Sequence, residues 1–159
     1  MRRVRTWHRD IWGHALAALA VGLAGHGAVA EPVGPKLPPE LRRLLQQEMV
    51  AIRAASHDIL DALIEGDSRI VAERAQAIHD SFIMQRSLSE ADKRVLEETL
   101  PASFVALDRR FHETAAEVAA AARAGERGAQ HAGFRRLLET CSSCHAAFAG
   151  ARFPGFEAE

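Results

Sequence analysis

The chain has 159 residues, a formal net charge of −1, two cysteines and no tyrosine. This length is typical of one domain, the balanced charge excludes a strongly basic nucleic-acid-binding face, and two cysteines are too few for a scaffold held by several disulfides. Hydrophobic residues make up 48% of the chain, which is too many for a disordered protein. The composition therefore predicts a folded domain with an apolar core and no nucleic-acid partner.

Residues 1–30 have the features of a secretory signal peptide. Four arginines lie within the first nine residues, residues 15–24 form an apolar run, and Ala28-Val29-Ala30 fits the small-x-small cleavage rule. The apolar run is shorter than the roughly 20 residues that span a bilayer. An uncleaved membrane anchor is the alternative. We expect cleavage after Ala30, which would release a protein without a membrane span into the periplasm.

Two further regions follow the predicted signal peptide. Residues 31–39 contain four prolines in nine positions, so we expect an extended leader that is not a packed element. Residues 40–159 form the second region, in which apolar residues recur at helical spacing and no stretch alternates strictly with period two. This pattern predicts a single all-α domain.

The apolar pattern predicts four long helices, over residues 40–65, 68–86, 101–122 and 129–149. Gly66 ends the first helix, and Asp67 and Ser68 can each cap the second, while residues 87–100 form a small insert in which Ser89 begins a helical turn. The expected core stripe of the first helix comprises Leu45, Met49, Ile52, Ser56, Ile59 and Leu63. That of the fourth comprises Phe134, Leu138, Cys141, His145 and Phe148. Four amphipathic helices with short connections predict an antiparallel four-helix bundle.

The segment Cys141-Ser142-Ser143-Cys144-His145 has the CxxCH spacing of haem c attachment. Two thiols add across the two vinyl groups at one porphyrin edge, so they must lie close together on one side. Positions three and four apart face the same way on a helix, so Cys141, Cys144 and His145 would be presented together. We therefore predict one covalently attached haem c, held by Cys141 and Cys144, with His145 as the proximal iron ligand.

Three other interpretations of the two cysteines stay open. They could form a disulfide in an oxidising compartment, which would give a haem-free helical module. They could form a dithiol redox pair, although such motifs belong to a βαβ setting that the sequence lacks. They could bind zinc, although a structural zinc site needs further ligands.

The position of the motif on the last helix resembles the class II cytochromes c, the cytochrome c′ family and its low-spin, six-coordinate relatives. The resemblance rests on the helix layout, the three motif residues, Phe148 directly after them and Met49 in the first helix. It implies a four-helix bundle with haem attached to the C-terminal helix. It also leaves a homodimer open, because members of the family often pair. Members commonly carry a basic residue after the Phe, whereas this chain has Ala149.

The resemblance also indicates the distal iron ligand, which must come from upstream because no methionine follows His145. In the low-spin relatives a Met on the first helix fills this position, and we assign it to Met49. Where that residue is apolar, the iron stays five-coordinate and open to small gases. Two alternatives are that His79, at the border of the second apolar face, is the ligand, or that Met49 only fills core. The remaining helical histidines are interpreted as surface residues: His57, His112 and His131.

The functional prediction is a periplasmic monohaem cytochrome that transfers one electron at a time between redox partner proteins. The alternative is a five-coordinate haem protein that binds NO or CO. Phosphate loops, metalloprotease signatures and nucleophile elbows are not found in the sequence, so an enzyme is not predicted.

Overall fold

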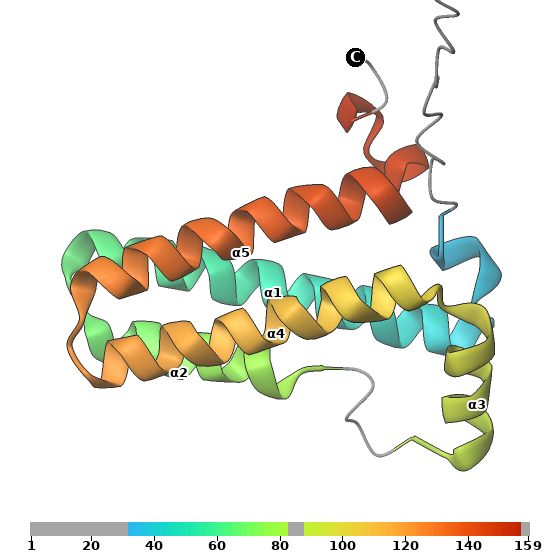
Figure 1. The fold of residues 1–159 in the computed structure, drawn as a ribbon, viewed down its shortest axis with the longest axis horizontal. Coiled ribbons are helices and arrows are strands. Elements are labelled where there is room, and N and C mark those ends of the chain that lie inside the picture. The colour runs from blue at the N-terminus through green and yellow to red at the C-terminus, as the bar shows by residue number, and fades with distance from the viewer. Residues whose placement is uncertain (1–31, 83–87, 157–159) are drawn as a thin grey trace, which may run out of the picture.

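The computed structural model describes residues 32–82 and 88–156, and every regular element in these two ranges is a helix (Figure 1). The long helices are α1 (Pro39–Glu65), α2 (Ser68–Asp80), α4 (Ala102–Arg123) and α5 (Arg127–Phe148). The shorter elements are α3 (Glu90–Thr99) and the 3₁₀ turns η1 (Gly34–Lys36), η3 (Gly150–Arg152) and η4 (Pro154–Phe156).

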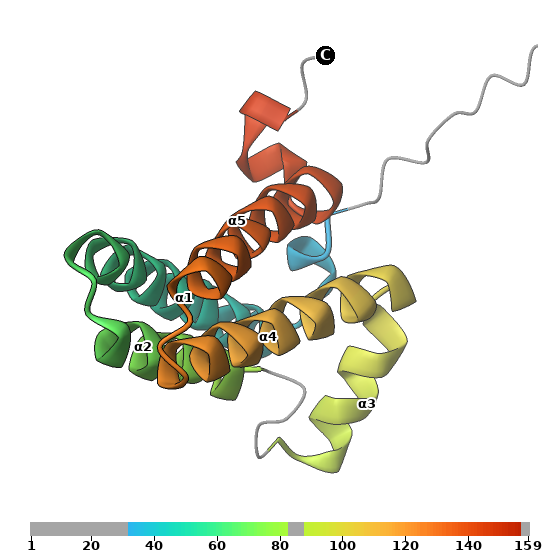
Figure 2. The same ribbon diagram turned by 60° about the vertical axis from the view of Figure 1, so that its left-hand side comes forward.

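The four long helices form the bundle that the sequence predicts. The pairs α1/α2, α2/α4 and α4/α5 pack directly on each other, whereas α1 and α5 are not closely packed. The chain leaves α4 through a short loop, so α5 starts beside the end of α4 and diverges from it toward its own C-terminus (Figure 1). The short α3 runs across the end of the bundle in both views (Figure 2). The CxxCH segment lies near the C-terminal end of α5, where this helix has diverged from α4.

The turn between α1 and α2 forms as the sequence predicts. Gly66 adopts a left-handed conformation with φ 76°, which an L side chain adopts only with strain, and its N–H donates to the carbonyl of Ala62. Asp67 then caps α2, because its Oδ1 accepts from the N–H groups of Arg69 at 3.0 Å and Ile70 at 3.1 Å. These two residues reverse the chain and set α2 antiparallel to α1.

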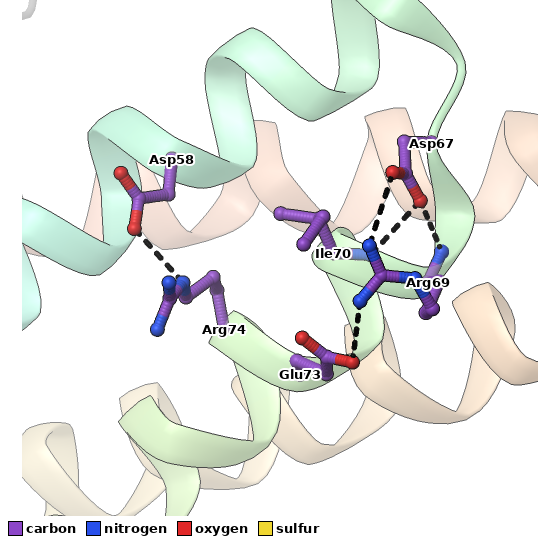
Figure 3. A network of polar contacts seen from close by, with 6 residues as sticks. All are labelled: Asp58, Asp67, Arg69, Ile70, Glu73 and Arg74. Atoms are coloured by element: carbon purple, nitrogen blue, oxygen red, sulfur yellow. Dashed lines mark hydrogen bonds and ion pairs between the residues drawn. The ribbon is translucent and has the colours of Figure 1, made fainter.

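Ion pairs on the surface of the α1/α2 hairpin add to this connection (Figure 3). Arg74 on α2 places its Nε 2.8 Å from Oδ2 of Asp58 on α1. Arg69 pairs with Glu73 one turn later, at 2.8 Å. Exposed pairs of this kind contribute less than about 1 kcal/mol each, so burial of the apolar face remains the main source of stability.

The second predicted helix is shorter than expected. It was predicted to reach residue 86, but α2 ends at Asp80, with Ser81 in a turn and Phe82 outside the helix. Residues 83–87 lie outside the described part of the chain. The insert contains α3, and Ser89 caps it as predicted by accepting from the N–H of Asp92 at 3.1 Å.

The prediction of an unpacked leader over residues 31–39 is wrong for the described residues. Val33 and Leu37 are both buried, and the N–H of Val33 donates to the carbonyl of Phe148 at 3.2 Å. The 3₁₀ turn η1 spaces these two apolar side chains so that both face the bundle, which prolines alone could not reveal. The predicted signal peptide, residues 1–30, lies outside the described residues.

The buried apolar side chains fall into two clusters along the bundle. The first cluster lies toward the α1/α2 and α4/α5 turns and includes Ile52, Ile59, Val71, Ile78, Phe111, Ala115, Val118, Phe134 and Leu137. The second cluster lies toward α3 and the leader and comprises Val33, Leu37, Leu41, Leu96, Leu100, Phe104 and Phe148. The boundary between them falls near residue 48 of α1 and residue 108 of α4. This boundary is the level of the site described next.

Candidate functional site

The CxxCH residues lie in the last two turns of α5, across the boundary between the two core clusters. Cys141, Cys144 and His145 are all half-buried. Cys141 packs against the first cluster and Cys144 against the second. The helix therefore holds both sulfurs and the imidazole at one level of the bundle, on neighbouring turns.

The chemical state of these three side chains suits a porphyrin and its iron. Both cysteines are free thiols, and burial raises the pKa of Cys141. Burial also raises the pKa of Cys144 to about 11, with further contributions from the charges of Asp108 and Cys141. Both sulfurs are therefore reduced and free of any disulfide, as attachment to the two vinyl groups requires.

The surroundings of His145 favour its neutral form, which a metal ligand requires. Burial and then the charge of Arg152 lower its pKa, so the ring keeps a lone pair for a metal at neutral pH. Phe153 stacks on the imidazole with the ring centroids 4.3 Å apart and an interplanar angle of 13°. Ala149 stands where members of the resembled family commonly carry a basic residue. In this chain the basic side chain that lowers the pKa of His145 comes from Arg152, three residues later.

Met49 lies on α1 at the same level. It is half-buried and packs against the first cluster, as Cys141 does from α5. Leu45, one turn earlier, packs against the second cluster. Two thiols, an imidazole and a thioether are the donor set of a covalently attached, six-coordinate haem, so the residues present fit this group.

Among the other histidines, His79 is half-buried on α2, and its Nδ1–H donates to the backbone carbonyl of His112 at 3.0 Å. This bond gives His79 a structural role between α2 and α4. His57 and His131 are exposed, as predicted. The prediction of a surface position for His112 is wrong, because this ring is only 1% exposed.

Comparison with protein families identifies the chain. The sequence model of the family described as cytochrome C′ matches residues 45–149, which cover α1 from its second turn to the end of α5. The chain belongs to the cytochrome c′ family. Members of this family are non-enzymatic haem proteins that bind one covalent haem c, and the spacing of Cys141 and Cys144 fits the CxxCH attachment motif. No curated protein and no solved structure matches the chain.

This cytochrome contains a buried polar cluster that the sequence interpretation missed. Glu48 on α1 and Asp108 and His112 on α4 are 1%, 7% and 1% exposed. His112 Nε2 lies 3.4 Å from Glu48 Oε1 and 3.7 Å from Asp108 Oδ1. On its other side, His112 Nδ1–H donates to the carbonyl of Ile78 on α2 at 2.7 Å. We call Glu48, Asp108 and His112 the acid–histidine cluster.

The geometry of the cluster fixes one hydrogen on Nδ1 of His112 and favours a second on Nε2. The Ile78 carbonyl accepts only, so Nδ1 of His112 must hold a hydrogen. A neutral ring would then direct the lone pair of Nε2 at two carboxylates. Although burial alone favours the neutral ring, the neighbouring Glu48 and Asp108 and the Ile78 carbonyl raise the pKa of His112. The favoured state is therefore an imidazolium between two carboxyl groups.

Asp108 connects the cluster to the haem-attachment helix. Burial raises its pKa to about 6, opposed by His112 and reinforced by the charge of Glu48. Its charge in turn contributes to the raised pKa of Cys144 on α5. All four long helices therefore contribute to the surroundings of the acid–histidine cluster. The contribution of α2 is the backbone carbonyl of Ile78, which accepts from His112.

A signal for the cluster was present in the sequence. Asp108 and His112 follow the core residue Phe104 at steps of four, and Glu48 precedes the core residue Ile52 by four. His112 was interpreted as a surface residue because it directly follows the core residue Phe111, so its side chain was expected about 100° away from the apolar stripe. The buried face of α4 is wide because α4 packs on α2 and α5 together, and a single stripe does not describe it.

Within residues 32–82 and 88–156, no group of three or more His, Cys, Asp and Glu residues is arranged to hold a metal ion. No helix in those ranges is both long and apolar enough to cross a bilayer.

Proposed function

We propose that this protein is a periplasmic electron-transfer cytochrome of the cytochrome c′ family with a six-coordinate haem iron. In this proposal Cys141 and Cys144 hold the haem, His145 is the proximal ligand and Met49 is the distal ligand. Haem supplies reversible one-electron oxidation and reduction of its iron. The residues around it determine whether that iron is reached by electrons alone or also by small ligands.

The observation that carries the proposal is the placement of Met49. Its half-buried side chain and that of Cys141 pack against the same core cluster from α1 and α5, two helices that are not closely packed on each other. A thioether opposite an imidazole favours the ferrous state and closes the sixth position. Both effects suit a carrier that exchanges electrons and binds no exogenous ligand.

Apolar side chains would keep water away from the same level of the bundle. Phe104 on α4 packs edge-on against Phe148 on α5, with centroids 5.3 Å apart. Phe82 stacks on His112 at 4.9 Å. A dry surrounding lowers solvent reorganisation and influences the potential of a bound metal centre.

An optical experiment tests the assignment of Met49. The full chain is expressed with c-type haem maturation, and spectra of the oxidised and reduced protein are recorded with and without CO. We expect low-spin spectra that CO does not change, and high-spin, CO-sensitive spectra for Met49→Ala. Met84→Ala serves as the control, since it removes the other methionine that follows the predicted signal peptide. A wild-type protein that binds CO would contradict the assignment.

The alternative function is capture of NO or CO at a five-coordinate iron. In this alternative Met49, which packs against the first core cluster, would only fill core. In that case Met49→Ala would lose stability without any change in spin state. The same spectra therefore separate the two functions.

Export to the periplasm is supported by the features of residues 1–30. We expect the mature protein to begin at Glu31 and to be released with the periplasmic fraction. Mass spectrometry of the purified holoprotein measures both the cleavage site and the mass added by one haem. A mass that retains residues 1–30 would support the membrane-anchor alternative.

A further inference from the structure

We infer that Phe153 is a positioning residue for His145, whose imidazole it holds in one orientation by stacking on the ring. The inference rests on the proposed haem site, in which His145 is the proximal iron ligand, but it does not require Met49 as the sixth ligand. Phe153 belongs to the C-terminal tail, residues 150–156, which follows α5. The family match ends at residue 149, so the ring that contacts the proximal ligand comes from outside the matched residues.

A sharp turn after α5 brings Phe153 back to His145. On a continued α-helix these two residues would be about 12 Å apart along the axis, since each residue rises about 1.5 Å, and their rings could not stack. Instead the helix ends at Phe148, and Ala149 leaves it with φ −141° and ψ 20°. The turn η3 then reverses the chain, and the N–H of Phe153 closes it by donating to the carbonyl of Gly150 at 2.7 Å. This turn lies directly beyond the end of α5 (Figure 1).

The backbone on both sides of Phe153 is held in place. The carbonyl of Phe153 accepts from the N–H of Phe156 at 3.1 Å, and Pro154 disfavours a helical conformation at the residue before it. Phe153 accordingly has φ −126° and ψ 72°. At the base of the tail, the side chain of Phe148 is buried in the second core cluster and its carbonyl accepts from the N–H of Val33 at 3.2 Å. The tail therefore starts from a fixed helix end.

The two rings form a nearly parallel stack. Their centroids are 4.3 Å apart and their planes differ by 13°, so Phe153 covers one face of the imidazole. The torsion that turns a histidine ring about its Cβ–Cγ bond has a broad distribution. Turning the ring of His145 out of the stack would drive its edge into Phe153. The stack therefore restricts a torsion that is otherwise loosely determined.

This stack takes the place of the hydrogen bond that usually orients a metal-binding histidine. Such a histidine commonly donates its second ring N–H to a carboxylate or a carbonyl, which fixes the plane of the ring. In the parts of the chain that the structure describes, neither ring nitrogen of His145 makes a hydrogen bond to another residue. The rings of His79 and His112, by contrast, are each bonded to a backbone carbonyl, at 3.0 and 2.7 Å. The plane of the His145 ring is thus restrained by an aromatic contact.

A fixed ring plane has a consequence that can be measured on the ferric holoprotein. The π orbitals of an iron-bound imidazole overlap with iron orbitals in a direction set by the plane of the ring. That direction determines how unpaired electron density is distributed over the porphyrin, and hence the paramagnetic shifts of the haem methyl protons. A single ring orientation gives one set of methyl signals, whereas a ring that adopts several orientations gives broadened or additional signals.

Proton NMR of the ferric holoprotein tests the inference. We expect one set of haem methyl signals for the wild type, and loss of that single set for Phe153→Ala, which removes the stack. Phe153→Tyr keeps a flat ring and should restore the wild-type pattern. An unchanged pattern in Phe153→Ala, or a pattern in Phe153→Tyr like that of the alanine variant, overturns the inference.

The matched control is Phe156→Ala in the same tail. Phe156 is 46% exposed and stacks on no aromatic ring among the described residues, while its N–H, which bonds to Phe153, is kept by alanine. Phe156→Ala should therefore retain the wild-type methyl signals. Loss of the single set in this variant as well would trace the effect to the tail as a whole and overturn the assignment to Phe153.

Phe153→Leu separates stacking from apolar cover, and it serves equally if the alanine variant fails to accumulate as holoprotein. Leucine keeps an apolar side chain beside His145 but has no flat ring. We expect it to lose the single set of methyl signals as Phe153→Ala does. A Phe153→Leu holoprotein with the wild-type pattern overturns the inference, because cover alone would then be sufficient.

The outcomes also separate this inference from the proposed function. Haem content and CO binding are recorded for each variant before NMR. If the wild type binds CO and Phe153→Ala still loses the single set of signals, the electron-transfer proposal fails and the inference about Phe153 stands. If CO has no effect and the signals of Phe153→Ala equal those of the wild type, the reverse holds. A wild type without haem refutes both.

Discussion

The close approach of α5 to α4 depends on Gly133, and its replacement by alanine gives a prediction with a definite sign. A Cβ at Gly133 would lie 2.5 Å from Cγ2 of Val118 on α4. Carbon atoms in contact prefer about 3.5–4.0 Å, so one of the helices or the valine must move by roughly 1 Å. Val118 cannot easily turn aside, because a β-branched side chain in a helix has one strongly preferred rotamer.

Two opposing terms set the magnitude of this effect. Alanine is favoured over glycine inside a helix by about 1 kcal/mol. Overpacking a tight core contact costs about 1–3 kcal/mol. The expected net result for Gly133→Ala is a loss of about 1 kcal/mol in the free energy of unfolding. Gly128→Ala, in the first turn of the same helix, meets nothing within 4 Å and should be neutral or slightly stabilising.

Urea denaturation of the holoproteins, followed by circular dichroism, measures these differences. A double-mutant cycle isolates the contact: in a Val118→Ala background the clash is gone, so Gly133→Ala should become stabilising. If Gly133→Ala is as stable as Gly128→Ala in the wild-type background, the close packing of α4 and α5 is not what the structure implies. A cycle without coupling would lead to the same conclusion.

Three further predictions concern single positions. Gly66→Ala should cost about 1 kcal/mol in the free energy of unfolding because φ is 76°, while Gly66→Asn, which tolerates that conformation, should lose less by the same denaturation assay. Asp67→Ala should cost about 1 kcal/mol by removing the cap of α2, whereas Asp67→Asn should retain most of it; equal losses would rule out capping as the cause. Because the pKa of Asp108 is raised from 3.8 to about 6 in the folded state, its stabilising contribution is complete below pH 4 and is lost as the pH rises through 6. Wild type should therefore lose up to about 3 kcal/mol relative to Asp108→Asn between pH 4 and pH 8, and parallel pH profiles of the two proteins would contradict the assigned burial.

The parts of the fold that depend on short stretches of sequence could be predicted. Gly66, Asp67 and Ser89 each act on backbone groups within four residues of themselves, so the turn, the cap of α3 and one of the two candidate caps of α2 were predicted correctly. The CxxCH motif likewise has its chemistry in five consecutive residues. The family of the chain was predicted from that motif together with the order of the four helical segments, and the match to the family model confirms it.

The parts that depend on which helices meet could not be predicted from periodicity alone. Leu138 was placed in the core stripe of the fourth helix, yet it is 48% exposed and the neighbouring Leu137 is buried. The predicted stripe steps from Phe134 to Leu138, whereas the structure buries Phe134 and Leu137, in a helix that diverges from α4 along its length (Figure 1). The burial of Val33 and Leu37 likewise depends on tertiary packing, since the cluster that covers them is assembled from α1, α3, α4 and α5.

The acid–histidine cluster is costly for a bundle of this size, and its cost is an argument for function. Three of its polar atoms have no hydrogen-bond partner among the described residues, and each such atom costs about 1–3 kcal/mol. Apolar residues of similar volume at these positions would commonly be as stable or more so. Groups that destabilise a fold while carrying shifted pKa values concentrate at functional sites.

Asp108→Asn tests whether that argument applies here. The substitution is expected to stabilise the protein at pH 8, because burial raises the pKa of Asp108 to about 6. A more stable Asp108→Asn holoprotein with an altered optical spectrum would mean that the cluster is retained for its effect on the haem. A more stable holoprotein with the wild-type spectrum would mean that the cluster serves only to specify how α1, α2 and α4 meet, where His112 Nδ1–H donates to the Ile78 carbonyl and Nε2 lies 3.4 Å from Glu48 Oε1.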